Sequence, residues 1–142
     1  LMFVTSNKPI DAYSKGGLET GVDGANPYRL ITMLLDGAVF SLGRAAQALK
    51  EKRVDQKGKE ISMAIDIISS GLQASIDLEA GGEIAERLNS LYDYMCTRLL
   101  HANLHNDLAA IQEVSGLLGE IKSAWEEIAN DPAVASRNKV AA

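Results

Sequence analysis

Two histidines, His101 and His105, come nearest to the spacing of a chemical site. Four residues apart on a continuous helix, they would share one face and could bind a metal ion together. The alternative is a pair of solvated side chains in a last helical turn, since two imidazoles alone leave a metal site open and weak. The chain also lacks the Glu-x-x-His pair of carboxylate-bridged di-iron bundles. We therefore expect no bound metal.

The single cysteine, Cys96, is the other candidate for covalent chemistry. It lies among Met95, Leu99 and Leu100, so we interpret it as a small core residue and not as a reactive thiol. The glycines near the N-terminus follow no strand pattern, and no P-loop motif occurs. We expect neither a cofactor nor an enzymatic activity.

Composition narrows the class of protein further. The 142 residues suit one domain with its own core, and 46% of them are hydrophobic. A net charge of −5 without a long Lys/Arg cluster argues against nucleic acid or an anionic membrane as partner. A lone cysteine is compatible with a reducing compartment, and no signal peptide or membrane-spanning apolar run is apparent. The sequence therefore predicts a cytoplasmic protein.

Four segments carry apolar residues at helical three- and four-residue steps. The first helix is predicted to start at Asn26-Pro27, because asparagine caps free amide groups and proline presets the first turn, and to end near Lys52. The second is predicted to be capped by Asp55 and to end at Gly81-Gly82.

The third and fourth helices follow the same pattern. The third carries its apolar stripe from Ile84 to Leu100 and is predicted to stop near Asn103. Asn106 or Asp107 would cap the fourth, whose stripe from Leu108 to Ile128 must end before Asp131-Pro132. Four amphipathic helices with short connections predict an all-α, antiparallel four-helix bundle.

Three regions follow from this pattern. Residues 1–25 are predicted to form a glycine-rich, flexible segment, in which Ile10, Tyr13 and Leu18 could dock on the bundle and cap it. The bundle spans 26–130, and 131–142 is predicted to be a disordered tail.

The first two helices have more apolar residues than one seam requires. Val39 and Phe40 widen the apolar arc of the first helix, as Met63 and Ile67 widen that of the second. Either the core uses these residues or they form an exposed interaction surface. Gly37 leaves a similar choice, between tight helix packing and the close approach of a partner.

A resemblance to a known protein family favours the second alternative, an exposed interaction surface. The run LEAGGEIAERLNSLYDYM at positions 78–95, the helix start Asn26-Pro27 and the sequence Asp36-Gly37-Ala38 resemble the flagellar export chaperone family, and the likeness extends to Trp125. It implies a cytoplasmic bundle that binds the disordered C-terminal segment of flagellin, prevents premature polymerisation and supports delivery to the type III export gate. The alternatives are a helical regulatory module with another client, or a metal-binding bundle.

The expected client contacts lie near the start of the first helix and on the last one. Apolar helical positions serve a groove or a core equally well, so each of these residues could instead be buried. The predicted partner-binding residues are Tyr13, Ile31, Leu34, Leu35, Leu42 and Trp125.

Overall fold

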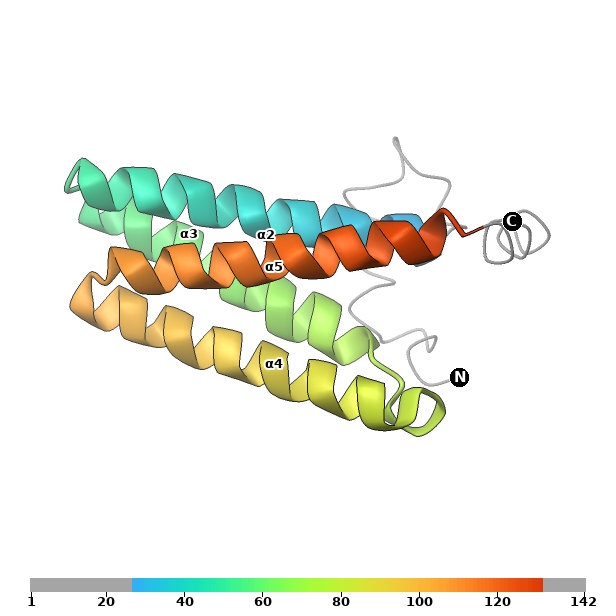
Figure 1. The fold of residues 1–142 in the computed structure, drawn as a ribbon. Helices are drawn as coiled ribbons and strands as arrows, with labels where there is room; N and C mark the ends of the chain where they lie inside the picture. The colour runs from blue at the N-terminus through green and yellow to red at the C-terminus, as the bar shows by residue number, and fades with distance from the viewer. Residues whose placement is uncertain (1–26, 132–142) are drawn as a thin grey trace.

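The computed structural model describes residues 27–131, and every regular element in this part of the chain is helical. The elements are α2 (Pro27–Lys50), α3 (Val54–Asp66) with its continuations η2 (Ile67–Leu72) and η3 (Gln73–Ser75), α4 (Leu78–His105) and α5 (Leu108–Ala129). In Figure 1 these helical rods run alternately in opposite directions. The predicted all-α, antiparallel four-helix bundle is confirmed. The predicted segment 1–25 and the tail from 132 onward lie outside the described residues.

The helices follow one another around the bundle. α2 packs along both α3 and α5, while α4 packs against α5, α3 and η2. In Figure 1, α5 lies in front and α3 behind, so these two helices face each other across the bundle. The outer face of α3 and the outer face of α5 are therefore separate surfaces of the molecule.

The connection between α2 and α3 differs from the prediction. The helix α2 begins at Pro27 and ends at Lys50, close to the predicted bounds, whereas Asn26 lies outside the described residues. Lys52 takes a left-handed conformation, with φ of 60°, and reverses the chain at once. Arg53 then occupies the N-cap without a side-chain hydrogen bond, so the predicted cap at Asp55 is wrong. Asp55 lies two positions later, in the first turn, where its charge favours the helix dipole.

The second helical rod ends earlier than predicted. After the π-helical η2 and the short η3, Ile76 is extended, with ψ of 134°, and ends the rod before Gly81-Gly82. The carboxylate of Asp77 accepts a hydrogen bond from the amide of Ala80 and so starts α4 upstream of the glycines. Gly82, with φ of 57°, instead places a kink inside α4, in a conformation that favours glycine.

The last turn matches the prediction more closely. α4 continues to His105, two residues beyond the predicted end, and Asn106 closes it in the left-handed conformation. Asp107 caps α5 by accepting a hydrogen bond of 3.2 Å from the amide of Ala110, which confirms one of the two predicted caps. α5 ends at Ala129, before Asp131 as predicted.

The core runs the length of the bundle. It takes leucine, isoleucine and alanine from all four helices, with Tyr92 and Met95 from α4. The largest side chains that are almost wholly buried are Leu35, Leu42, Ile61, Ile68, Met95, Leu99, Ile111, Leu118 and Val114. No helix among residues 27–131 is long and apolar enough to cross a membrane.

Candidate functional site

The two histidines lie together at the C-terminal end of α4. Their ring centroids are 4.6 Å apart, and Nε2 of His101 lies 3.2 Å from Oδ2 of Asp107. Both His101 and His105 are exposed, in agreement with the solvated interpretation. Within the described ranges, no three histidine, cysteine or acidic side chains are grouped so as to hold a metal ion.

Cys96 is a packing residue on α4. It is half-buried and contacts the hydrophobic core. Burial raises the pKa of its thiol, and the nearby Asp93 carboxylate raises it further. The reactive thiolate form is therefore disfavoured, as the sequence interpretation required.

A polar network joins α4 to α5 beside the histidines. The Tyr94 hydroxyl donates a hydrogen bond to Glu113, and Nε of Arg98 donates one of 2.9 Å to the other oxygen of that carboxylate. These two hydrogen bonds lower the pKa of Glu113. The pKa of Tyr94 is raised by the same Glu113 contact, so the proton stays on the phenol.

This network is expected to contribute to the loss of folding stability at acid pH. Because the pKa of Glu113 is lower in the folded chain than in the unfolded one, its stabilising effect is present above the ordinary carboxyl pKa and is lost as the pH falls through the folded value. We expect Glu113→Gln to flatten the fall of melting temperature below about pH 5. Thermal unfolding followed by circular dichroism across this range tests it, and identical acid slopes in the two proteins would contradict it.

Two of the predicted partner-binding residues lie at the α2–α5 seam. Ile31 and Trp125 are half-buried and pack against the core. The Trp125 indole donates a hydrogen bond of 3.0 Å to the carbonyl of Tyr28, and their ring centroids are 5.0 Å apart. This aromatic pair fixes the C-terminal half of α5 on the first turn of α2, and its partial exposure leaves an apolar edge there.

The other predicted contacts occupy different places. Leu35 and Leu42 are fully buried and Leu34 nearly so, all within the main core cluster. Each points inward because α2 packs against helices on two sides, which leaves these three positions no open face. A client could not contact them while the bundle is closed. Tyr13 lies outside the described residues.

Several large apolar side chains are exposed instead. The side chains of Phe40 and Met63 are 65% and 53% exposed. At these two positions, the first two rods therefore have the outward-facing apolar side chains that the sequence pattern indicated. Ile67, by contrast, is buried, and a Cβ at Gly37 would meet its Cδ1 at 3.5 Å, an ordinary contact. Close packing of α2 on η2 therefore does not require Gly37.

Further apolar residues on α4 and α5 are exposed, although their sequence pattern does not predict this. Ile84, Leu100 and Ile128 were assigned to buried stripes, yet all three are exposed, as is Leu104. Ile84 and Ile128 lie at the end of the bundle where Figure 1 shows α4 and α5 diverging from their shared turn. Leu100 and Leu104 lie toward the opposite end. The divergent end, with the nearby aromatic pair, is the strongest candidate for binding a segment of another protein.

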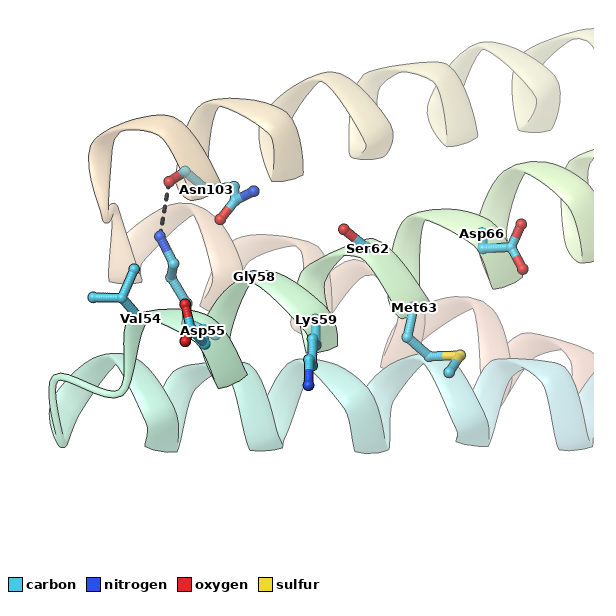
Figure 2. Close-up of a pocket in the computed structure, with 9 residues that line it drawn as sticks. Val54, Asp55, Gly58, Lys59, Ser62, Met63, Asp66 and Asn103 are labelled. Carbon is cyan, nitrogen blue, oxygen red and sulfur yellow. Dashed lines mark hydrogen bonds between the residues drawn. The ribbon is translucent and has the colours of Figure 1, made fainter.

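A shallow hollow of about 750 Å³ lies on the outer face of α3 (Figure 2). Gly58 forms part of its lining, and a Cβ there would meet Oδ1 of Asn103 at 3.9 Å. Nζ of Lys57 donates hydrogen bonds to the Asn103 carbonyl, drawn dashed in Figure 2, and to Oδ1 of Asn106. The hollow has charged groups of both signs and no reactive cluster, which suits docking better than catalysis.

Comparison with known proteins identifies the family to which this four-helix bundle belongs. The profile of the family described as Flagellar protein FliS matches residues 9–132. The chain belongs to the FliS family. A flagellar secretion chaperone FliS of Salmonella typhimurium is 51% identical over 119 residues, which cover 84% of this chain and 88% of that protein.

Two further FliS relatives agree. The flagellar secretion chaperone FliS of Escherichia coli K12 is 40% identical, with 89% of this chain and 93% of that protein covered. The flagellar secretion chaperone FliSB of Pseudomonas aeruginosa is 42% identical, with 87% and 97% covered. FliS is a family of export chaperones and not of enzymes, so the resemblance seen in the sequence and the prediction of a non-enzymatic protein are both confirmed.

Proposed function

We propose that this chain is a cytoplasmic export chaperone that binds the disordered C-terminal segment of flagellin, prevents its premature polymerisation and supports its delivery to the flagellar type III export apparatus. Membership in the FliS family supports the general role. The observation that carries the binding part of the proposal is the exposed apolar surface that remains after the four helices have formed a complete core.

The exposed apolar surface meets the physical requirements for binding a disordered client. A disordered segment that folds on binding pays about 2–5 kcal/mol for ordering, so it needs an extensive contact area. An amphipathic client helix would place its apolar side chains every three or four residues along the groove between two helices. The exposed apolar side chains of Ile84 and Ile128, at the divergent end of the bundle, offer such contacts.

The proposed contacts combine predicted and newly found residues. Ile31, Trp125 and Ile128 offer the apolar edge at the divergent end of the bundle, and Tyr13 of the N-terminal segment is proposed to cover this edge until a client displaces it. Leu34, Leu35 and Leu42 support this surface from the core without direct contact.

The test compares two matched substitutions in binding to a flagellin C-terminal peptide. Ile128→Asp places a charge at the proposed edge and is expected to weaken the affinity about tenfold or more. Leu104→Asp, the control, makes the same kind of change at an even more exposed position at the other end of the bundle and should leave the affinity within about twofold. Calorimetry measures both, with circular dichroism to verify folding.

A reversed order of effects would contradict the proposed location, as would equal binding by both variants.

Deleting residues 2–25 tests the covering role of Tyr13 in the same assay. Removal of a competing segment should raise the affinity, because the binding-competent fraction of the chaperone increases. Unchanged or weaker binding would contradict the covering role.

A further inference from the structure

The first turns of α4, residues 78–87, are mostly exposed, and we call them the entry turns. Every residue in this range is exposed except Ala85, and the Ile84 side chain is 77% exposed. Ile84 lies about four helical turns before Arg98, on the side of α4 from which Arg98 reaches Glu113 of α5. Since α5 diverges from α4 at this end of the bundle (Figure 1), that side stays open around Ile84. The entry turns are therefore a surface that another segment can cover.

The charges at this end of the bundle are unbalanced. Three exposed carboxylates form no hydrogen bond or ion pair within residues 27–131, those of Glu79 and Glu86 in the entry turns and of Glu127 in α5. The basic side chains of the entry turns and of α5 are already paired. Arg87 lies 3.5 Å from Glu83, and Lys122 lies 2.6 Å from Asp36. The surface is therefore complementary to a positively charged segment.

The end of the printed sequence, residues 132–142, has that composition. It contains Arg137 and Lys139, with Val134 and Val140 nearby, and it contains no acidic residue. The segment that precedes α2 has more acidic than basic residues, and the chain as a whole has a net charge of −5. Charge therefore favours residues 132–142 over the N-terminal segment or a second copy as the occupant of this acidic surface.

This basic segment also starts at the level of the entry turns. The hydrogen bond from Tyr94 to Glu113 sets the antiparallel register of α4 and α5. Fifteen residues back along α4 and fifteen forward along α5 from that contact, Glu79 is level with Ile128. Arg137 follows Ile128 by nine residues, which span up to about 30 Å when extended. Packed helix axes lie about 8–10 Å apart, so the segment is long enough to cross from α5 to a diverging α4.

We propose that residues 132–142 dock on the entry turns of α4. Arg137 and Lys139 pair with the two free carboxylates of the entry turns, and a valine of the same segment covers Ile84. The covalent tether holds the segment at a high effective concentration, so that exposed ion pairs, which are individually weak, are enough for partial docking. Because Ile84 also offers a contact to the client, the docked segment competes with the client. This consequence rests on the proposed function.

Hydrogen exchange of the full chain, without client and at low salt, tests the docking. Arg137→Glu with Lys139→Glu should speed amide exchange in the entry turns about threefold, because docking opposes their local opening. Lys52→Glu with Lys59→Glu makes the same change of net charge at two exposed lysines in the other half of the bundle, and should leave that exchange unchanged. The buried stretch of α4 around Met95 is the internal reference. High salt should remove the difference between wild type and the Arg137/Lys139 variant.

Reversing the charges on both sides gives a second test. Glu79→Lys with Glu86→Lys removes the acidic partners, and adding these changes to the Arg137→Glu, Lys139→Glu chain restores opposite charges. The entry turns should therefore exchange more slowly in the fourfold variant than in the chain with Glu79→Lys and Glu86→Lys alone. Equal exchange in these two chains would overturn the proposal, as would equal exchange in wild type and the Arg137/Lys139 variant at low salt. Circular dichroism establishes that each variant is folded.

Calorimetry with a flagellin C-terminal peptide measures the competition. The chain with Arg137→Glu and Lys139→Glu should bind the peptide about threefold more tightly than wild type, because more of the chaperone is free to bind. Equal affinities would overturn the competition. A peptide that binds neither chain would contradict the proposed function, whereas the exchange measurements, which contain no client, decide the docking by themselves.

Discussion

Replacing Leu42 with alanine is expected to lower the free energy of unfolding by about 2–5 kcal/mol. Leu42 is fully buried in the cluster that joins α2 to its neighbours, so the substitution removes apolar burial and leaves a cavity that rigid helices cannot fill. Urea unfolding at one protein concentration, followed by circular dichroism, measures the change.

The control is an equivalent truncation at the surface. Leu104→Ala removes the same atoms from a side chain that is 78% exposed, and its effect should stay within about 0.5 kcal/mol. A loss for Leu42→Ala no greater than this control would mean that Leu42 faces a client groove and not the core. The pair of variants therefore separates the two roles that the sequence could not distinguish.

Replacing Lys57 with methionine is expected to lower the free energy of unfolding by about 1–3 kcal/mol. Lys57 is buried, and its Nζ donates hydrogen bonds of 2.9 Å to the Asn103 carbonyl and 2.6 Å to Oδ1 of Asn106. Methionine has a similar shape but no donor, so the end of α4 loses a positive charge that stabilises its dipole and satisfies its terminal carbonyl. The same unfolding measurement detects the loss.

The matched control for that variant is Lys50→Met. Lys50 is exposed in the last turn of α2, where removing its charge should cost only a few tenths of a kcal/mol. Equal effects of the two substitutions, or a more stable Lys57→Met protein, would contradict the role of Lys57 in holding the α4–α5 turn on α3.

Much of the fold could be predicted because helical periodicity is a local property. The stripes around Leu42, Ile61, Leu99 and Ile111 identify helix interiors, since residues three and four apart must share a face. The ends of the helices were harder to predict from the sequence. Asp77 and the glycine pair could each mark a boundary, and only the hydrogen bond that the Ala80 amide donates to the Asp77 carboxylate decides which of them separates the rods.

The candidate site was less predictable from sequence. Leu99 and Leu100 are adjacent in sequence but about 100° apart around α4, and the first is buried while the second is exposed. Which of them meets a neighbour depends on where α3 and α5 lie, and periodicity contains no such information. Similarly, Ile31 remains partly exposed, whereas Leu35, one turn later on α2, is fully buried. Only the assembled bundle distinguishes these positions.

We propose that exposed apolar surface on this bundle binds and folds a disordered flagellin segment. The most direct test of this proposal is a calorimetric titration of the full chain with a flagellin C-terminal peptide at several temperatures. We expect saturable binding whose enthalpy becomes more exothermic with temperature, because apolar surface is buried and the peptide becomes ordered. A properly folded protein that gives no binding heat at any temperature, and no change in circular dichroism on mixing, would contradict it.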